Sequence, residues 1–305
     1  MRKARIAVVG GGLMGHGVAQ VFACAGHSVR ITDASADARS RIVQRVGANL
    51  NDLGLARESL FLIAVHESLE ETVTGADWVI EAAPEDLTLK QAIFAQIERA
   101  APVGAILASN TSVIPITQIM ANVARKERAL GTHWWNPPYL VPLVEVVRTS
   151  ATSDACVAST MGLLEAVGKQ PVEVKKDVAG FVGNRLQHAL WREAIALVAD
   201  GVCDAETVDT VVKSSFGARL AVLGPLENAD MVGADLTQSI HRNVLPHLDR
   251  STTPSPYLDG VVGEGRLGLK SGMGFHAWPV ERQAALRRKV TEHLRKSFKT
   301  TPMED

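Results

Sequence analysis

A glycine-rich turn near the amino terminus constrains the fold of this chain more than any other feature. A short apolar run, residues 5–9, leads directly into Gly10-Gly11-Gly12-Leu13-Met14-Gly15, and a helical pattern follows. Strand, glycine turn and helix in this order are the context in which G-x-G-x-x-G indicates a dinucleotide-binding unit. Gly10 permits the tight turn, Gly12 lets the backbone approach a pyrophosphate, and Gly15 lets the helix pack close to the strand. The N–H groups at the start of the helix, from Leu13 and Met14 onward, would face the phosphates.

An acidic residue follows the second predicted strand. Residues 28–32 read as a strand that leads into Asp33, about 20 residues after the first glycine of the turn. A carboxylate at this place accepts hydrogen bonds from the adenosine ribose hydroxyls and repels a 2′-phosphate. The sequence therefore predicts that the chain binds NAD in preference to NADP. A glycine-rich turn that binds no nucleotide is the alternative.

One histidine and one glutamate lie on two later apolar runs. Residues 131–135 and 142–147 are predicted strands, and Asn136-Pro137-Pro138 turns the chain between them because proline cannot continue a ladder. His133 and Glu145 can then face each other. A carboxylate against an imidazole fixes its tautomer and raises its basicity, which suits a general base near neutral pH. An ordinary hairpin with a satisfied core histidine is the alternative.

The size and charge of the chain restrict the classes of protein it can represent. At 305 residues it exceeds the size at which one hydrophobic core usually stops growing, so two domains are expected. Its 32 basic and 33 acidic residues give a net charge of −1 with no basic stripe, so no nucleic-acid partner is expected. No apolar stretch approaches the length of a membrane span, so no membrane partner is expected either.

The cysteines indicate a reducing compartment. Cys24, Cys156 and Cys203 are widely spaced, without a Cys-x-x-Cys pair or the Cys/His spacing of a zinc site. This pattern predicts neither a disulfide framework nor a metal site. A cytoplasmic location is therefore expected. The start Met1-Arg2-Lys3 resembles that of a signal peptide, but the apolar run after it is too short for one.

Strand-like and helix-like segments alternate up to about residue 175, and only helix-like segments follow. Alternation predicts a parallel sheet with helices on both faces, whereas a run of helices predicts a separate helical domain. We therefore expect an α/β fold, with a doubly wound, Rossmann-type NAD-binding domain over residues 1–177 and a smaller all-α domain over residues 178–305. The predicted strands are residues 5–9, 28–32, 60–65, 77–82, 105–108, 131–135, 142–147 and 171–174. The predicted helices are residues 13–25, 36–53, 87–100, 114–120, 154–167, 181–200, 205–214, 230–244 and 279–298.

A polar cluster, Ser109-Asn110-Thr111-Ser112, follows the predicted strand 105–108. Ligands of open parallel sheets collect at the carboxyl ends of the strands, so this cluster is placed to reach a cofactor or substrate. Thr111 or Ser112 could also cap the predicted helix 114–120. Both roles can hold at once.

Seven blocks of the sequence resemble the L-3-hydroxyacyl-CoA dehydrogenase family. They occur in the order and spacing of that family over nearly the whole chain. The blocks are the glycine fingerprint of residues 10–15, Glu81-Ala82-Ala83-Pro84-Glu85 with Lys90, Ala108-Ser109-Asn110-Thr111-Ser112, His133-Trp134-Trp135-Asn136-Pro137, Leu143-Val144-Glu145-Val146, Gly180-Phe181-Val182-Gly183-Asn184-Arg185 and Lys270-Ser271-Gly272-Met273-Gly274-Phe275.

The resemblance implies a role for several of these residues. His133 matches the general base of the family and Glu145 the carboxylate that orients it. Ser112 and Asn184 would hydrogen-bond the reacting oxygen. Positions that contact the nicotinamide half of NAD in this family are matched by Glu85, Lys90 and Asn136.

Three residues of the matching blocks also have purely structural alternatives. Asn184 could cap a helix start, Lys90 could lie on a solvated helix face, and Lys270 could be a loop cation. The family commonly pairs through its helical domain, so the resemblance also implies a homodimer.

The chain departs from the family in the segments that bear on the substrate. Members that act on coenzyme A thioesters usually carry a lysine-rich helical extension, whereas residues 34–60 are short and contain no lysine. Asn136-Pro137-Pro138-Tyr139 and residues 218–225 look more like the branch that oxidises small free hydroxy acids, which includes L-gulonate 3-dehydrogenase with its lens-crystallin relatives, carnitine dehydrogenases and a pyridine-carboxylate dehydrogenase.

Arg219 lies in one of these divergent segments. Its guanidinium could clamp a free carboxylate through two parallel hydrogen bonds. An exposed, solvated arginine is the alternative. We therefore expect oxidation of a small 3-hydroxy acid, with an L-3-hydroxyacyl-CoA such as 3-hydroxybutyryl-CoA as the alternative substrate. A structural, crystallin-like NAD-binding protein is the alternative of another class.

Overall fold

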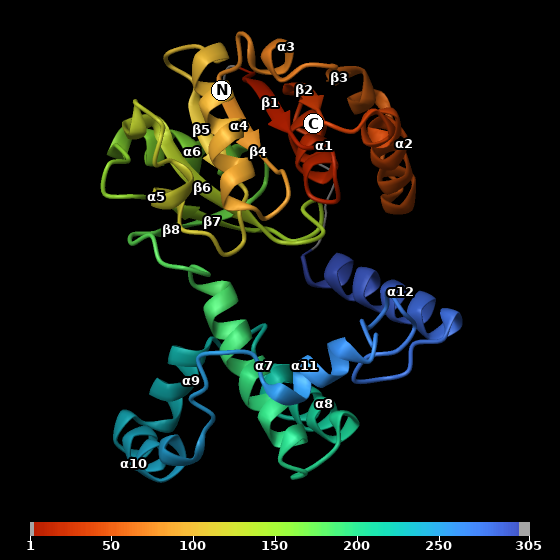
Figure 1. The fold of residues 1–305 in the computed structure, drawn as a ribbon, viewed down its shortest axis with the longest axis vertical. Helices are drawn as coiled ribbons and strands as arrows, with labels where there is room; N and C mark the ends of the chain where they lie inside the picture. The colour runs from red at the N-terminus through yellow and green to blue at the C-terminus, as the bar shows by residue number, and fades with distance from the viewer. Residues whose placement is uncertain (1–2, 299–305) are drawn as a thin grey trace. The chain divides into compact units, whose positions relative to one another are not determined.

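The computed structural model describes residues 3–298 and divides into two compact units. One unit comprises Met1–Arg185 with Thr291–Asp305 and contains the β-sheet; we call it the sheet unit. The other comprises Leu186–Val290 and is built of helices; we call it the helical unit. Figure 1 shows the order of the elements along the chain.

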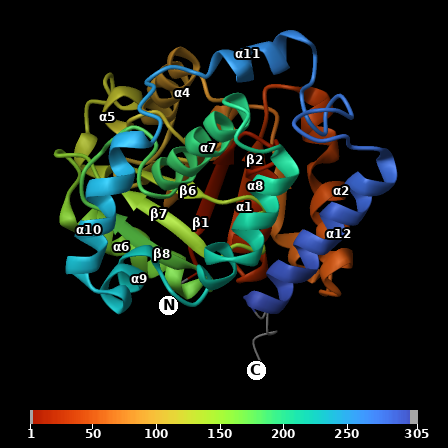
Figure 2. The same cartoon turned by 90° about the horizontal axis from the view of Figure 1, so that it is seen from below.

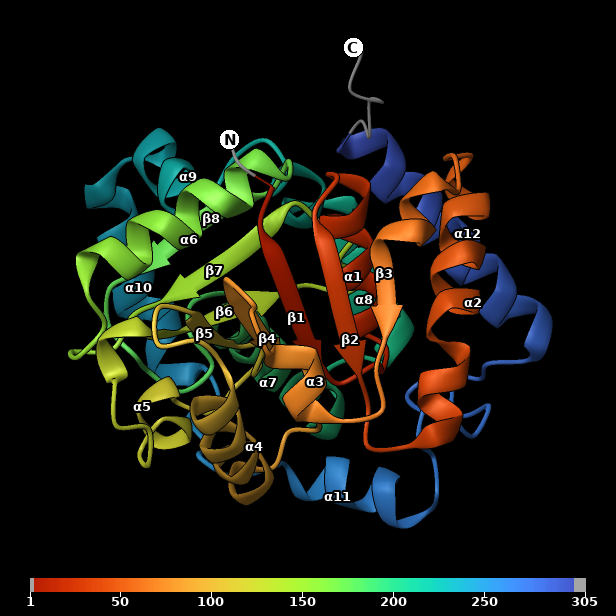
Figure 3. The ribbon, with the colours of Figure 1, turned by 90° about the horizontal axis from the view of Figure 1, so that it is seen from above.

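Eight strands form one sheet in the sheet unit. They are β1 (Arg5–Val9), β2 (Ser28–Thr32), β3 (Ile63–Val65), β4 (Trp78–Glu81), β5 (Ile106–Ser109), β6 (Ala129–Trp134), β7 (Leu143–Val147) and β8 (Gln170–Val174). Their order in the sheet is β3-β2-β1-β4-β5-β6-β7-β8, and every neighbouring pair is parallel except β6 and β7. The chain therefore reverses its direction of growth between β3 and β4, which confirms the doubly wound arrangement (Figure 3).

Helices cover both faces of this sheet. They are α1 (Gly15–Cys24), α2 (Ala36–Leu53), α3 (Leu69–Val73), α4 (Leu87–Ala100), α5 (Ile116–Ile119) and α6 (Asp154–Ala166), with the short 3-10 helices η1 (Glu58–Leu62) and η2 (Lys126–Arg128). Because side chains alternate along a strand, Ile6 and Val8 pack in one core with α1, α2 and α6. Ala7 and Val9 pack on the opposite face with α3, α4 and α5.

Local signals in the sequence set the ends of the long helices. The Ser35 hydroxyl accepts the N–H of Ala38 at the start of α2, and Gly54 ends that helix at φ +69°. The Asp86 carboxylate accepts the N–H of Leu89 at the start of α4. Both helices therefore have the bounds that the sequence predicts.

The helical unit contains the remaining elements, α7 (Gly183–Ala199), α8 (Ala205–Ser214), η3 (Phe216–Arg219), α9 (Pro225–Val232), α10 (Ala234–Val244), η4 (Leu245–His247), α11 (Pro256–Gly263) and α12 (Val280–Ser297). The first residues of α7 and the last of α12 belong to the sheet unit. Within the helical unit, α9 contacts α10 (Figure 2). Helix α8 contacts η3. Among residues 3–298, none of the helices is long and apolar enough to cross a membrane.

The predicted strand 60–65 is wrong in its first half. Residues 58–62 form η1, and only Ile63–Val65 pair with β2. Phe61 is 90% exposed, so the apolar run is not a buried strand. Apolar periodicity alone does not distinguish a buried strand from a short, exposed apolar helix.

Two predicted helices have different bounds. The helix predicted at 114–120 is the shorter α5, because Pro115 precedes it and Asp177 accepts the N–H groups of Ile116 and Thr117. Thr111 and Ser112 therefore do not cap α5, although the Thr111 hydroxyl accepts the N–H of Ile114.

The segment predicted as one helix at 230–244 is interrupted at Gly233, whose φ is +106°, so the last three residues of α9 and all of α10 take its place. The sequence patterns missed α3 and α11.

Candidate active site

The glycine turn between β1 and α1 is shaped for the close approach of a ligand. Gly10 adopts φ +110°, which side chains disfavour, and a Cβ there would lie 2.5 Å from the carbonyl oxygen of Ala82. A Cβ at Gly15 would lie 1.7 Å from the carbonyl oxygen of Gly10, so no side chain fits between helix and strand. Among the described residues, no atom other than those of its chain neighbours lies within 4 Å of the Cβ position at Gly12. This open space suits a pyrophosphate.

Asp33 directly follows β2 beside this turn. Its two carboxylate oxygens accept the N–H of Gly11 at 2.8 Å and the N–H of Ser35 at 2.9 Å. The Gly10 N–H donates to the Thr32 carbonyl at 2.8 Å and ties the turn to the end of β2. Each carboxylate oxygen keeps a lone pair, so Asp33 can still accept ribose hydroxyls.

A cavity of about 830 Å³ extends along this edge of the sheet. Its lining includes eight residues that the sequence predicted for the site: Gly10, Gly12, Leu13, Met14, Asp33, Glu85, Asn110 and Ser112. The sequence analysis missed Leu89, Ile93 and Gln96, which also line it. These three occupy one stripe of α4 at helical spacing, and that stripe is the signal that would have found them.

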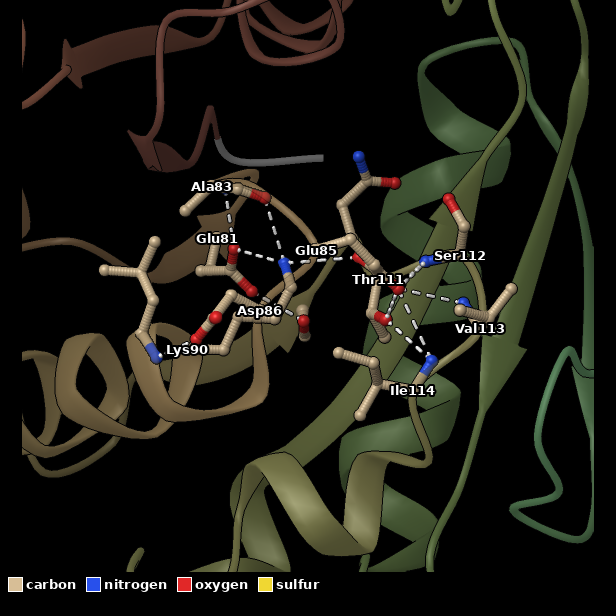
Figure 4. A network of polar contacts seen from close by, with 12 residues as sticks. Glu81, Ala83, Glu85, Asp86, Lys90, Thr111, Ser112, Val113 and Ile114 are labelled. Carbon is tan, nitrogen blue, oxygen red and sulfur yellow. Dashed lines mark hydrogen bonds and ion pairs between the residues drawn. The ribbon is translucent and has the colours of Figure 1, made fainter. Parts of the chain in front are cut away.

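A buried ion pair supports Glu85 (Figure 4). Lys90 and Glu81 are both fully buried, and the Lys90 Nζ lies 2.7 Å from Glu81 Oε1. Nζ also donates to the Ala83 carbonyl at 3.0 Å and lies 3.7 Å from the Glu85 carboxylate. The other oxygen of Glu81 accepts the Ser109 hydroxyl at 2.6 Å. Lys90 is therefore not on a solvated helix face, and its charge is satisfied within the protein.

The Glu85 carboxylate accepts several hydrogen bonds from the loop after β5 (Figure 4). One of its oxygens accepts the Thr111 hydroxyl and the N–H groups of Ser112 and Val113, the latter two at 3.0 Å. Burial alone would raise the pKa of Glu85, but these hydrogen bonds and the Lys90 ammonium outweigh burial and lower the pKa. Glu85 is therefore ionised at neutral pH and orders the loop that carries Ser112.

His133 and Glu145 face each other across the antiparallel strands β6 and β7. They are direct partners in the strand register, and the Nδ1 of His133 lies 2.7 Å from Glu145 Oε2. Both side chains are buried. Because an ionised carboxylate only accepts hydrogen bonds, Nδ1 carries the proton and Nε2 keeps its lone pair. The predicted juxtaposition of the two side chains is confirmed.

The second oxygen of Glu145 ties this dyad to the start of α7. Glu145 Oε1 accepts the N–H of Val182 at 2.9 Å and that of Gly183 at 3.1 Å. Burial alone would raise the pKa of Glu145, but the bond to His133 and the two backbone donors outweigh it and lower the pKa. An ionised carboxylate held by three donors orients the imidazole and stabilises the imidazolium.

Phe181 packs against the dyad in a conformation that the sequence does not signal. It is buried and adopts φ +51°, which costs a residue other than glycine about 1–3 kcal/mol. Its ring centroid lies 5.7 Å from that of His133, and the Trp135 ring lies 5.1 Å from His133. Two aromatic rings therefore wall the imidazole. Trp134 instead is buried in the core.

Ser112 and Asn184 lie together near the dyad. The Asn184 side chain donates through Nδ2 to the Ser112 carbonyl at 2.8 Å. Asn184 is the second residue of α7 and follows Gly183, whose N–H reaches Glu145. It does not cap the helix start, because its amide reaches across to another loop. The start of α7 thus joins Ser112 to the residues that orient His133.

Three further predicted residues differ in their surroundings. The Asn110 side chain accepts the N–H of Trp134 at 3.0 Å and so links the polar cluster to β6. Asn136 follows β6 with an exposed side chain. Arg219 ends η3 in the helical unit and is exposed.

Two family models match consecutive parts of the chain. The model described as "3-hydroxyacyl-CoA dehydrogenase, NAD binding domain" matches residues 5–178, and the model described as "3-hydroxyacyl-CoA dehydrogenase, C-terminal domain" matches residues 180–278. The chain belongs to the 3-hydroxyacyl-CoA dehydrogenase family. This finding confirms the resemblance seen in the sequence.

Individual relatives of this chain include enzymes named for different substrates. The 5-formyl-3-hydroxy-2-methylpyridine 4-carboxylate 5-dehydrogenase of Mesorhizobium japonicum is 37% identical over 286 residues, which cover 92% of this chain and 93% of the relative. L-carnitine dehydrogenase of Streptomyces coelicolor is 38% identical over 235 residues, which cover 76% of this chain and 74% of the relative.

A crystal structure of a 5-formyl-3-hydroxy-2-methylpyridine 4-carboxylic acid 5-dehydrogenase, described as "an NAD+ dependent dismutase", is also similar. It has a TM-score of 0.88 and 34% identity, with 97% of this chain and 96% of that chain covered. The fold prediction is confirmed by this likeness. The open space over Gly12 and the carboxylate of Asp33 fit the phosphates and ribose of NAD. The protein is an NAD-dependent dehydrogenase of the hydroxy acid and hydroxyacyl-CoA class.

Proposed function

We propose that this enzyme oxidises the secondary hydroxyl of a small 3-hydroxy acid to the 3-oxo compound. The observation that carries the proposal is the 2.7 Å contact between His133 Nδ1 and Glu145, which leaves Nε2 as the base. Bound NAD supplies the acceptor for the hydride of the carbinol carbon. His133 takes the hydroxyl proton during oxidation, and its imidazolium returns that proton during reduction of the ketone. Glu145 holds the imidazole in the required tautomer.

The reacting oxygen needs donors as negative charge develops on it. We assign this role to the exposed Ser112 hydroxyl and to the second N–H of the Asn184 amide, since the first donates to the Ser112 carbonyl. Glu85 orders the Ser112 loop, so both donors belong to segments that are fixed by hydrogen bonds. Such pre-ordered donors stabilise the transition state more than donors that must first be oriented.

In this proposal the predicted cofactor-binding residues contact different parts of NAD. Gly10, Gly12, Leu13, Met14 and Gly15 meet the pyrophosphate, and Asp33 accepts the adenosine ribose hydroxyls. Asn110, Glu85 and Asn136 lie toward the nicotinamide half. Lys90 acts through Glu81 and Glu85, because its own side chain is fully buried.

The substrate class follows from the helical unit and from the relatives. The pyridine 4-carboxylate dehydrogenase carries a carboxylate in the name of its substrate, and L-carnitine dehydrogenase is a second non-thioester relative. Arg219 is exposed and can clamp such a carboxylate. The lysine-free segment at residues 34–60 disfavours a coenzyme A thioester. A 3-hydroxyacyl-CoA such as 3-hydroxybutyryl-CoA is the second candidate, favoured by the family description itself.

A structural role without turnover would fit the same fold. Two contacts argue against it: the bond between His133 and Glu145, and the bond from the Asn184 amide to the Ser112 carbonyl. A structural protein has no need of this arrangement. We further propose a cytoplasmic homodimer that pairs through the helical unit. The three cysteines are all unpaired, as a reducing compartment favours.

The experiment that tests the proposal is an assay of NADH formation across small free 3-hydroxy acids and 3-hydroxybutyryl-CoA. The wild-type enzyme is compared with Arg219→Met and with the control Arg242→Met, which removes another exposed arginine of the helical unit. We expect Arg219→Met to raise KM for the free acid at least about tenfold, the loss of a charge-assisted pair, with little effect on the thioester. The free-acid proposal would fail if the wild type turned over the thioester efficiently and Arg219→Met left the KM of every free acid unchanged. The substrate would then be an acyl-CoA.

A further inference from the structure

The loop at residues 135–142 connects β6 to β7 and therefore joins the strands that carry His133 and Glu145. We call it the connecting loop. Its interior is a tight turn in which the N–H groups of Leu140 and Val141 both donate to the Pro137 carbonyl at 3.0 Å. Asn136 lies at its start with an exposed side chain. The conformation of this loop thus sets where the Asn136 amide is held.

A buried lysine bonds to this loop from the turn between α6 and β8. The Lys169 Nζ donates to the carbonyl of Pro138 at 2.5 Å and to that of Val141 at 3.0 Å. It also lies 5.7 Å from the ring centroid of Trp134, the neighbour of His133. Lys169 is only 9% exposed, and the proposed chemistry makes no use of its amine. Burying an amine is costly, and here hydrogen bonds to two carbonyls offset that cost.

The connecting loop also rests on the helix of the glycine fingerprint. A Cβ at Gly17 of α1 would lie 3.0 Å from both Cγ and Cδ of Pro138 and 3.4 Å from Cδ1 of Tyr139. The absence of a side chain at Gly17 is therefore what lets the loop approach α1 this closely. The loop is held by Lys169 and packed against the cofactor-binding helix.

We infer that Lys169 is a positioning residue, which keeps the connecting loop against α1 and so places Asn136 for the nicotinamide half of the cofactor. This inference rests on the proposed function, in which Asn136 contacts that half. Lys169 itself touches neither substrate nor cofactor. Its effect on the reaction is through the loop alone.

The contact should persist when the amine titrates. Burial lowers the pKa of Lys169 to about 8. A neutral amine still has two N–H groups, one for each of the carbonyls of Pro138 and Val141. Removal of the whole amine, as in Lys169→Met, is therefore the informative change.

Hydrogen exchange of the purified enzyme tests the loop without any turnover. We expect Lys169→Met to speed exchange of the amides of Leu140 and Val141 about tenfold, because the turn that protects them loses its two outer bonds. The matched control is Lys175→Met, which removes an exposed lysine just after β8 and should leave this exchange unchanged. Unchanged exchange in Lys169→Met would overturn the inference.

Kinetics then tests the link to Asn136. In Lys169→Met we expect kcat to fall about ten- to a hundredfold, as a misplaced group does, while the Kd for NADH changes less than about threefold. When Lys169→Met is combined with Asn136→Ala, kcat should fall little below that of Asn136→Ala alone, because both changes remove the same contribution of Asn136. Losses that multiply in the double variant would show that Lys169 acts only on the general fold, against the inference.

A second variant covers the case in which Lys169→Met does not fold. Gly17→Ala favours α1 as a helix but presses on Pro138, so it should displace the loop from the opposite side. It should likewise speed loop exchange and lower kcat more than it raises the Kd for NADH. Normal exchange in Gly17→Ala would count against the inference. A wild-type enzyme without turnover, but with the expected exchange changes, would contradict the proposed function and leave the role of Lys169 in the loop intact.

Discussion

The two units differ in how completely they bury their apolar side chains. The sheet unit has two cores, one on each face of the sheet, with residues such as Phe22 and Phe94 fully buried. In the helical unit, Val261 is the one hydrophobic side chain that is buried among the described residues. Val222 and Leu226 are 89% and 80% exposed there.

This difference indicates different requirements for the two units. The sheet unit contains the glycine turn, the dyad and Glu85 with hydrogen bonds already formed, so its chemistry is pre-ordered. We expect the exposed apolar side chains of the helical unit to form an interaction surface. A second copy of the chain, placed symmetrically, would cover the same surface on both partners. The comparison is consistent with the proposal that the sheet unit carries the catalytic residues and that the helical unit serves assembly and substrate choice.

The largest expected effect concerns His133, the proposed base in the sheet unit. His133→Ala should lower kcat by about two to four orders of magnitude, the usual contribution of a positioned general base. The Kd for NADH, measured by fluorescence, should stay nearly unchanged. His66→Ala, which alters a partly exposed histidine beyond β3, is the control. Near-normal turnover in His133→Ala would mean that another residue is the base.

The second prediction concerns the apolar surface of the helical unit. Leu226→Asp combined with Met231→Asp places two charges on α9, where both side chains are now mostly exposed. A dimer seen by light scattering for the wild-type chain should dissociate, because a charge is not tolerated in a desolvated interface. Phe61→Asp in the sheet unit, at a residue that is 90% exposed, is the matched control and should not dissociate it. Dissociation by Phe61→Asp but not by the double variant of α9 would place the interface in the sheet unit and contradict this prediction.

The third prediction concerns cofactor choice. Asp33→Ala removes the carboxylate that would accept ribose hydroxyls and repel a 2′-phosphate. The ratio of kcat/KM for NAD to that for NADP should therefore fall by at least about tenfold, the loss of one charge-assisted bond. Asp37→Ala in the first turn of α2 is the control in the same segment. Equal kcat/KM values for NAD and NADP in the wild type would contradict the role of Asp33 in cofactor choice.

The smallest expected effect concerns Glu85 and pH. Its folded-state pKa lies below the ordinary value of 4.5, so its ionised form contributes stability that is present above that pH and lost as pH falls through the lowered pKa. Glu85→Gln should lower the free energy of unfolding by about 1 kcal/mol at neutral pH. Urea titrations should show this difference shrinking below pH 4.5. A difference independent of pH, like that expected for the exposed Glu165→Gln, would contradict the assigned ionisation.

Much of the sheet unit could be predicted because its signals are local. Strand alternation, the glycine turn and the caps of α2 and α4 each follow from residues close in sequence. The register that sets His133 opposite Glu145 was also predictable, since residues 136–142 leave few ways to pair the two strands. The short helix η1 and the break at Gly233 could not be predicted. Apolar periodicity indicates neither how exposed a side chain is nor whether a single residue adopts a positive φ.

The supporting residues of the site were harder to predict. Lys90 lies on the same stripe of α4 as Phe94 and Ile97, so its burial was signalled by spacing but contradicted by its charge. The bonds from Glu85 to the Ser112 loop, from Glu145 to α7 and from Lys169 to the connecting loop join segments distant in sequence. Phe181 takes a left-handed conformation that no pattern of residue types requires. Such features depend on tertiary packing.

The most direct test of the account is the rate of NAD reduction by Glu145→Gln beside the wild type, with a small free 3-hydroxy acid as substrate. Glutamine keeps the size of Glu145 but cannot stabilise an imidazolium and permits the wrong tautomer of His133. The account predicts turnover by the wild type, a kcat at least about a hundredfold lower in Glu145→Gln, and a nearly unchanged Kd for NADH. Equal rates for the two proteins, or no NADH from the wild type with either a free acid or 3-hydroxybutyryl-CoA, would contradict it.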